Sequence, residues 1–400
     1  PFLSYLWVGS RKTLEVDDQT VSLDKTTGTR VVGIKERLIK DHRNIRNRAY
    51  ACAFLALALR RIRVWFNENL RDWYGDDEVR WIIHLGVPSI TADHALAQTW
   101  EEILCTAWGL SIQKKAVSLP EVEQYLVKEV IFKNDEKVKA IACPEISAAI
   151  NSIISCTHDA ENGQLYAAMD VGASTVDISA FFFTRGYRQT KYCTTLLGPQ
   201  IHILGTSFCH SNRMRALRRF VEKSRLTKEE KDNFIQKLLD NAELQPQTAL
   251  PDSVESYCEG VKLSSTSKFG PDNLLIEKLS ESLRTRILES WNGNFSRNSQ
   301  KIKVLLIGGG CHSGMYAETI KRAVNSKRAE LMEFPELPEA LSYSRLDSHR
   351  IDKESFWSRF SVAYGLALGK IGETEIETLD HEENPYEVKE LPGFIGKEMV

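Results

Sequence analysis

Residues 165–179 read LYAAMDVGASTVDIS, and this stretch decides the fold. An apolar run over 165–169 ends at Asp170, a turn of small residues follows, and a second run rich in β-branched and aromatic residues covers 175–183. Such residues favour strands, whereas glycine and small polar residues favour a tight turn. We therefore expect two strands joined by a turn, with a third strand over 187–196 completing a meander.

The turn after Asp170 carries the residue types of a phosphate-binding loop. Backbone N–H groups of a small-residue turn converge on an anion, and the hydroxyls of Ser174 and Thr175 add donors. Asp170 and Asp177 supply hard oxygen ligands of the kind that Mg²⁺ prefers. Taken alone, the segment also suits a plain β-hairpin in which Asp and Gly only satisfy the turn geometry.

A second glycine turn follows another apolar strand, predicted over 303–307. Gly308, Gly309 and Gly310 lead from this strand into a helix expected over 316–324, and such a turn lets a flat ligand approach the backbone at a helix N-terminus. A glycine-rich connection with no ligand is the alternative. Neither turn has the GxxxxGK[ST] or GxGxxG spacing, which disfavours a P-loop or Rossmann site. We expect the two turns to face each other across a crevice, holding opposite ends of one molecule.

The first 155 residues alternate helical and strand patterns. Residues 43–73 form an amphipathic helix, because the apolar positions Ala49, Ala53, Leu57, Ile62 and Trp65 recur at helical spacing with arginines on the other face. The following predicted elements are a strand over 81–88, a helix ending near Gly109, a strand over 138–143 and a helix over 146–154. Strands alternating with helices predict an α/β layer architecture.

Composition narrows the function classes. Four hundred residues predict two or three domains, and a net charge of −2 with 42% hydrophobic and 26% charged residues disfavours wholesale disorder and a basic nucleic-acid binder. The arginine clusters are interpreted as solvated or salt-bridged helix faces. With no apolar run long enough to span a membrane, no signal peptide and scattered cysteines without a CxxC pair, we expect a soluble cytoplasmic protein with buried free thiols and no membrane or nucleic-acid partner.

Taken in order, the segments of residues 30–370 resemble the ATPase domain of the 70-kilodalton heat-shock chaperones, within the actin/hexokinase superfamily. Residues 170–179 resemble that family's second phosphate loop, Asp-x-Gly-Gly-Gly-Thr-x-Asp-x-Ser. The other similar segments are Leu204-Gly205, Asn212-Arg213-Met214, Cys258-Glu259 with Lys262 and Thr266, the run from Leu305 to Gly310, the run from Ser147 to Ile150, and the run from Val362 to Ala367.

The resemblance implies a two-lobed actin-like ATPase fold with ribonuclease-H-like halves and an inserted helical subdomain. The implied first lobe covers residues 1–163, and the second lobe covers 164–222 and 301–350 around an insertion at 223–300. A hinge helix at 351–372 returns to the first lobe, where the helix containing Ser147 is its counterpart. Residues 373–400 are a tail or linker.

The resemblance also implies a function: a conformational switch that binds ATP or ADP with Mg²⁺, hydrolyses ATP, and acts on a protein client or co-chaperone. In it, Asp170 orients water or metal-bound water, Thr175 contacts the γ-phosphate and Asp177 lies near the cation. The residues implied to border the nucleotide are Gly172, Ala173 and Ser174 at the phosphates, and Glu259, Lys262, Thr266, Gly308 and Gly309 at the adenosine.

Two further site residues each have a second interpretation. Lys35 lies one position from the place of the family's catalytic lysine, and it equally suits a solvated lysine at the start of a helix. His312 stands where the family has an arginine that stacks on adenine, and it also suits an unliganded surface histidine. Both are therefore hypotheses about the site.

The sequence departs from the family at three places. Nothing before Gly33 matches the first phosphate loop, Ala173 and Ser174 stand where glycine is usual, and Pro144-Glu145 reverses the family's Glu-Pro. An N-terminally shortened or degenerate member is therefore expected. The alternatives that stay open are a nucleotide-binding scaffold without turnover and, more weakly, a small-molecule kinase of the same superfamily.

Overall fold

The computed structural model describes residues 6–8, 14–16, 29–31, 33–87, 94–113, 117–128, 138–156, 164–185, 192–224, 226–240, 271–292, 301–324, 329–336, 353–368 and 374–377. The chain divides into two compact units, and the first consists of residues 1–87 and 91–143. The second contains residues 144–400. The mixed α/β class expected from the sequence is confirmed.

The first unit is mainly helical. Its elements are β1 (Leu6–Val8), β2 (Leu14–Val16), β3 (Thr29–Val31), α1 (Ile34–Lys40), α2 (Ile45–Tyr74), β4 (Trp81–Val87), α3 (His94–Ser111), α4 (Leu119–Val127) and β5 (Val138–Pro144). The first three strands form an antiparallel sheet in the order β2-β1-β3, and β4 pairs with β5. The predicted helices over 43–73 and up to Gly109 are α2 and α3.

Helix α2 begins and ends where its sequence signals predict. The Asn44 side chain accepts hydrogen bonds from the amides of Arg46 and Asn47, and Gly75 ends the helix with a φ of 54°. The buried residues are mostly alanines of the N-terminal half, including Ala49 and Ala53. The predicted apolar face was wrong further along, because Ile62 and Trp65 are 41% and 55% exposed.

The arginines of α2 are engaged within the first unit. Arg48 pairs with Glu102 of α3 at 2.7 Å, and Arg46 pairs with Glu123 of α4. The Arg60 guanidinium donates to the carbonyl oxygens of Leu110 and Gln113 at the end of α3. A cation at a helix C-terminus satisfies carbonyls that lack partners in the helix. The interpretation of these arginines as salt-bridged is confirmed for Arg46 and Arg48.

The second unit contains a six-stranded sheet in the order β10-β9-β6-β7-β8-β11. Its strands are β6 (Gln164–Val171), β7 (Val176–Arg185), β8 (Tyr192–His202), β9 (Ile302–Ile307), β10 (Ala329–Leu331) and β11 (Thr374–Glu377). Strands β6, β7 and β8 form the predicted antiparallel meander. Strand β9 runs parallel to β6, and β10 runs parallel to β9.

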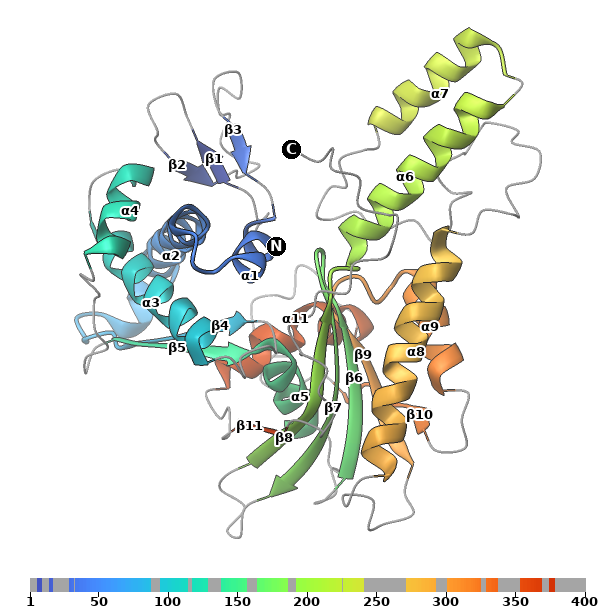
Figure 1. Ribbon diagram of the computed structural model, residues 1–400. Helices are drawn as coiled ribbons and strands as arrows, with labels where there is room; N and C mark the ends of the chain where they lie inside the picture. Colours follow the sequence, from blue (N-terminus) through green and yellow to red (C-terminus); the bar gives the residue numbers. More distant parts are fainter. Residues whose placement is uncertain are drawn as a thin grey trace. The chain divides into compact units, whose positions relative to one another are not determined.

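Helices cover both faces of this sheet (Figure 1). The helices of this unit are α5 (Glu145–Ser155), α6 (Thr206–Lys223), α7 (Lys228–Asp240), α8 (Pro271–Asn292), α9 (Gly314–Val324) and α11 (Lys353–Ala367). Helices α8 and α9 cover one face and α5 and α11 cover the other, whereas α7 packs on α6. Leu165, Ala167 and Met169 of β6 pack with α8 and α9, whereas Tyr166 and Ala168 pack with α5 and α11. This alternation is the period of two that a strand buried on both faces requires.

Helices α5 and α11 cross at very short distance. A Cβ built on Gly365 of α11 would overlap the backbone of Ala148 in α5, so only glycine fits at this crossing. The two small-residue segments that the sequence singled out as hinge partners therefore lie together. Both belong to the second unit.

Three predicted boundaries differ from the structure. The first unit ends at Cys143 instead of residue 163, because Ile146 and Ile150 of α5 pack on the six-stranded sheet. Helix α8 also packs on this sheet, through Leu275 and Leu279, so it is not part of a separate insertion over 223–300. Strand β11 pairs with β8 within the segment predicted as a tail.

The expectation of free thiols is confirmed for the six cysteines whose side chains the structure describes, of which Cys52, Cys105, Cys143 and Cys209 are buried. Burial raises the pKa of the Cys209 thiol to about 12 and that of Cys143 to about 11. No helix in the described part of the chain is long and apolar enough to cross a lipid bilayer.

The buried thiols predict a loss of stability at alkaline pH. The Cys209 pKa rises from an ordinary value of 9.0 on folding, so the unfolded chain loses this proton first as the pH increases. Stability is therefore complete below about pH 9 and declines above it, by up to about 1.4 kcal/mol per pH unit for one thiol. Urea unfolding at a series of pH values measures the slope. A Cys209→Ala variant should show a shallower slope, and an unchanged slope contradicts the assignment.

Candidate functional site

The candidate site is built on the hairpin between β6 and β7. Asp170 lies opposite Asp177 in the strand register, and Val171 lies opposite Val176. Residues 172–175 form the turn, which the Gly172 amide closes by donating to the Thr175 carbonyl at 2.9 Å. The sequence prediction of two strands and a small-residue turn is confirmed here.

The loop after β9 meets this hairpin directly. Because β6 and β9 are parallel neighbours, with Asp170 beside Ile307, their following turns emerge at the same end of the sheet. The Gly310 amide donates to the Val171 carbonyl at 2.9 Å. The two turns thus lie at the same end of the sheet. The predicted crevice between them is wrong, because the turns contact each other directly and are joined by a hydrogen bond.

Gly308 allows this close approach. Its φ is 87°, and a Cβ there would overlap the Asp170 carboxylate and the Val171 backbone. Gly310 is equally confined, by Val171 and Thr206, whereas a Cβ on Gly309 would meet nothing within 4 Å. The loop therefore requires Gly308 and Gly310 for packing, and it leaves Gly309 accessible to a ligand.

The N-terminus of α6 is anchored on the hairpin turn. The amides of Gly205, Thr206 and Ser207 donate to the carbonyls of Ser174, Gly172 and Ala173 at 3.2, 3.1 and 2.8 Å. The start of α6 therefore has no amides left for an anion at these three positions. Only glycine fits at position 205 in this contact, because a Cβ built there would lie 2.5 Å from the Ala173 carbonyl oxygen.

The turn keeps its own donors available. The backbone amides of Ala173, Ser174 and Thr175 make no hydrogen bond within the part of the chain that the structure describes. Ala173 is exposed and Thr175 is buried. Successive amides in a tight turn form a concave arrangement that binds anions. These three amides can receive a phosphate group.

Two carboxylates lie side by side behind the turn. Asp170 and Asp177 occupy directly opposed positions on β6 and β7 and are 9% and 2% exposed. By strand alternation both belong to the sheet face that α5 and α11 cover. Paired, buried carboxylates favour a nearby cation or a shared proton, because two adjacent negative charges disfavour each other.

This pair suits Mg²⁺ only together with a ligand that brings more oxygen atoms. Within the described residues, no group of three or more His, Cys, Asp or Glu side chains could hold a metal ion. Mg²⁺ bound with a nucleotide commonly takes one or two carboxylates, phosphate oxygens and waters. The donor chemistry of Asp170 and Asp177 fits that arrangement.

The remaining predicted residues are dispersed. His312 lies in the glycine loop, where it is exposed and its Nε2 forms a 2.6 Å hydrogen bond with Ser358 Oγ of α11. Lys35 lies on α1, in the first unit. Glu259, Lys262 and Thr266 fall outside the described residues. Within the second unit, the structure therefore brings together the two turns and both aspartates, with His312 in the glycine loop.

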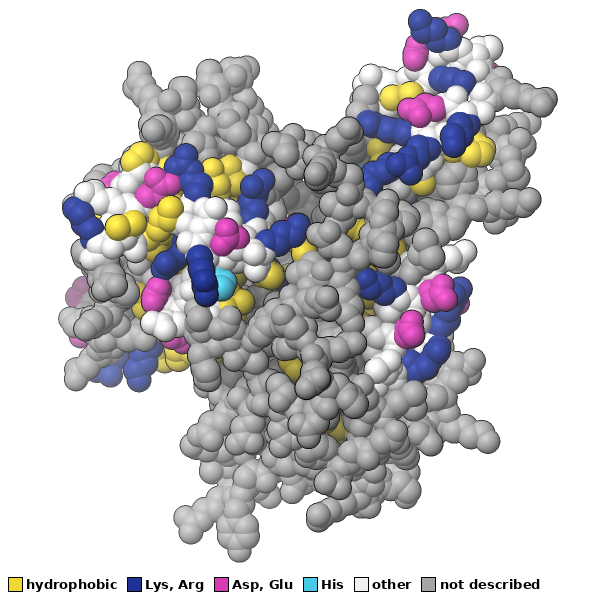
Figure 2. Space-filling view, viewed as in Figure 1, with side chains coloured by type: hydrophobic (Ala, Val, Ile, Leu, Met, Phe, Trp, Pro, Cys, Tyr) yellow, Lys and Arg dark blue, Asp and Glu magenta, His cyan; other side chains and the backbone are white. Residues whose placement is uncertain are grey.

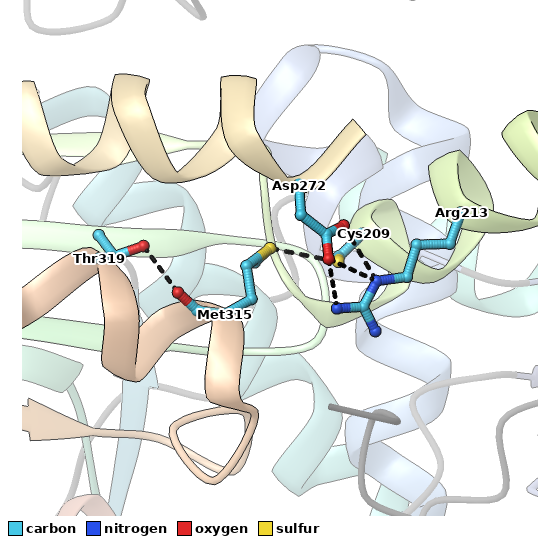
Figure 3. A network of polar contacts seen from close by, with 5 residues as sticks. All are labelled: Cys209, Arg213, Asp272, Met315 and Thr319. Atoms are coloured by element: carbon cyan, nitrogen blue, oxygen red, sulfur yellow. Dashed lines mark hydrogen bonds and ion pairs between the residues drawn. The ribbon is translucent and has the colours of Figure 1, made fainter. Parts of the chain in front are cut away.

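A buried polar network joins α6 to α8 and α9 (Figure 3). Arg213 of α6 is fully buried and binds Asp272 of α8 through two nitrogens, with Nε–Oδ1 at 3.0 Å and Nη2–Oδ2 at 2.8 Å. Cys209 Sγ donates to Met315 Sδ of α9 at 3.5 Å. The sequence indicated Arg213 but gave no sign of Asp272 as its partner.

The surface near α6 and α7 carries mixed charge. Lys and Arg side chains gather along these helices with Asp and Glu among them (Figure 2). Arg218, Arg219 and Lys223 are exposed, and so are Glu222 and Glu229. This pattern is typical of a solvated helix face.

No protein-family model matches this chain. No curated protein matches it either.

Proposed function

We propose that the protein is an ATP-binding conformational switch of the heat-shock chaperone kind, and that its second unit holds the nucleotide at the end of β6 and β9. The observation that carries the proposal is the junction of the two glycine turns through the Gly310–Val171 hydrogen bond, with the Asp170 carboxylate against Gly308. This junction combines free turn amides, paired carboxylates and an exposed glycine loop at one place.

The sheet supports the same proposal. Its antiparallel meander β6-β7-β8 continues into the parallel strands β9 and β10, with helices on both faces. We propose that this sheet is one of the two ribonuclease-H-like halves of an actin-like ATPase fold. Ligands of open α/β sheets bind beyond the carboxyl ends of the strands, which is where the two turns lie.

Each group of the site has a proposed role. The amides of Ala173, Ser174 and Thr175 bind the terminal phosphates, and the Thr175 hydroxyl adds a donor. Asp170 and Asp177 hold Mg²⁺, which neutralises charge on the phosphate oxygens when bound. Asp170 also orients the attacking water. Gly309 and His312 border the nucleoside, and the family resemblance extends the same role to Glu259, Lys262 and Thr266.

The switch itself is proposed to act through α5 and α11. Gly365 of α11 packs so closely against Ala148 of α5 that the distance between the two helices cannot decrease further. Helices packed this tightly move together as a rigid body. Nucleotide binding at the sheet end would change the position of α11 and so reach a protein client or co-chaperone. Lys35 of α1 is proposed as the catalytic lysine.

A scaffold that binds nucleotide without turnover is the second candidate. One observation favours it: the amides at the start of α6 donate to the hairpin turn, so they offer nothing to a transferring phosphoryl group. Ala173 in place of glycine also adds a Cβ at the turn. A small-molecule kinase is the third candidate and has the least support. For a kinase, a polyol or an acid would stimulate ADP production.

Nucleotide binding by the full chain tests the proposal. We expect calorimetry to show Mg²⁺-dependent ATP binding that Asp170→Asn weakens about tenfold or more, because a bond to a charged group is lost. Thr175→Ala should weaken it about threefold to tenfold. Asp232→Asn on the exposed face of α7 is the matched control and should bind as the wild type does.

The outcomes separate the candidates. Phosphate release from the wild type, lost in Asp170→Asn, supports the switch, whereas tight binding without phosphate release supports the scaffold. Absence of ATP binding by the wild type overturns the proposed function. Tight binding that neither variant changes places the nucleotide elsewhere and overturns the site assignment.

A further inference from the structure

The hydrogen bond between His312 and Ser358 links the glycine loop to α11. His312 Nε2 lies 2.6 Å from Ser358 Oγ. The imidazole is exposed, whereas Ser358 is only 1% exposed on a helix that packs against the sheet. An exposed ring is thereby held by a hydroxyl at a buried position of α11.

We infer that Ser358 is a positioning residue that fixes the His312 ring for contact with the nucleoside part of the ligand. This inference rests on the proposed function, because it names how one edge of that nucleotide site is held. Ser358 itself is too buried to touch a ligand, and its bond to the imidazole is the route by which we expect it to affect binding.

The chemistry of the ring agrees with this role. One ring nitrogen is occupied by Ser358, and the other, Nδ1, makes no hydrogen bond with the described residues. Because the bond from Nε2 to Ser358 restricts rotation of the ring, the Nδ1 atom and the ring face are presented in one direction. A ring that is fixed beforehand loses less conformational freedom when the ligand binds.

The loop geometry makes the same ring accessible. Cys311 and Ser313 donate through their amides to the carbonyls of Gly308 and Gly310, so the loop is a chain of consecutive turns. Gly308 and Gly310 are fixed against the hairpin. The loop is therefore held at its glycines by β6 and at His312 by α11, and both anchors lie on elements of the second unit.

A double-mutant cycle on the full chain tests the inference with two probes, Mg-ATP and inorganic tripolyphosphate. We expect Ser358→Ala to weaken ATP binding about threefold to tenfold, because the His312 side chain would then have to be ordered when ATP binds. His312→Ala should weaken it at least as much. Neither change should alter the affinity for tripolyphosphate, because the probe has no nucleoside.

The cycle also shows whether Ser358 acts through His312. In the His312→Ala background, Ser358→Ala should have no further effect on ATP affinity. In the chain with His312 intact, Ser358→Thr keeps the hydroxyl and should retain most of the wild-type affinity. Ser361→Ala is the matched control, because Ser361 is also 1% exposed on α11 and its hydroxyl makes no hydrogen bond with described residues.

Each result decides between the two proposals. Wild-type protein that binds neither probe overturns the proposed function. Wild-type ATP binding that Ser358→Ala leaves unchanged overturns the positioning role alone. A Ser358→Ala effect that persists without His312, or that extends equally to tripolyphosphate, shows a general structural role and also overturns it. His312 is exposed, so its variant provides a test that does not depend on a core substitution.

Discussion

Asp272→Ala is expected to lower the free energy of unfolding by about 3–5 kcal/mol, which is the cost of leaving a buried charge without its partner. Arg213 remains charged at every accessible pH, and its side chain is 0% exposed, so neither deprotonation nor water compensates for the loss. The bond is bidentate and joins α6 to α8, and these helices hold the back of the candidate site. Urea unfolding followed by circular dichroism measures the change.

Two further variants isolate the cause. Asp232→Ala removes an exposed carboxylate from α7 and should change the free energy of unfolding by less than about 0.5 kcal/mol. Replacing both partners, as Arg213→Met with Asp272→Leu, should recover most of the lost stability, because an apolar pair of similar volume removes the buried charge itself. If the double variant is as unstable as Asp272→Ala, the network contributes through something other than this ion pair.

The sequence predicted the second unit better than the first. Strands β6, β7 and β9 were found because each is a short apolar run bounded by turn residues, and this pattern depends on local chemistry. The extent of β8 was harder to predict, because the register shift opposite Ile178 and Ala180 lets the strand continue through Gly198-Pro199 to His202. Such an irregularity depends on strand pairing and has no local signal.

The predicted domain boundary at residue 163 differs from the structure because packing of α5 on the sheet determines which unit the helix belongs to. The polar residues around 158–163 predicted a boundary, but α5 belongs with the six-stranded sheet because Ile146, Ile150 and Ile153 face it. On α2 the periodicity predicted one continuous buried face, whereas α3 and the other neighbours cover mainly the small residues of its first half. Periodicity shows which residues share a face, and it does not show how much of that face another element covers.

The site was predictable to the extent that glycine marks close approach. The sequence names Gly308 and Gly309 as ligand residues, which stays a prediction. The structure shows close packing at Gly308 and Gly310, whereas a Cβ on Gly309 meets nothing within 4 Å, and Gly310 makes the joining hydrogen bond. Ser358 was not predicted, since it lies 46 residues from His312 and the intervening sequence gives no sign of the contact. Long-range polar partners of this kind are fixed only by the fold.

Gly308→Ala should both destabilise the protein and remove nucleotide binding. Alanine at a φ of 87° is strained, and its Cβ would overlap the Val171 backbone and the Asp170 carboxylate. Strain and overpacking together predict a loss of about 2–4 kcal/mol in the free energy of unfolding. Any adjustment that relieves the overlap must move either the loop or β6, and both carry the proposed site. We therefore expect ATP affinity to fall by more than about tenfold even in the folded fraction.

The neighbouring glycine provides the control for that prediction. A Cβ on Gly309 meets nothing within 4 Å, so Gly309→Ala should leave stability within about 0.5 kcal/mol of the wild type. Because Gly309 is exposed to the proposed ligand, this variant should still reduce ATP affinity modestly. If Gly308→Ala and Gly309→Ala had equal free energies of unfolding, the loop would not pack on Asp170 and Val171. Unchanged ATP affinity in both variants would show that the ligand does not approach this loop at all.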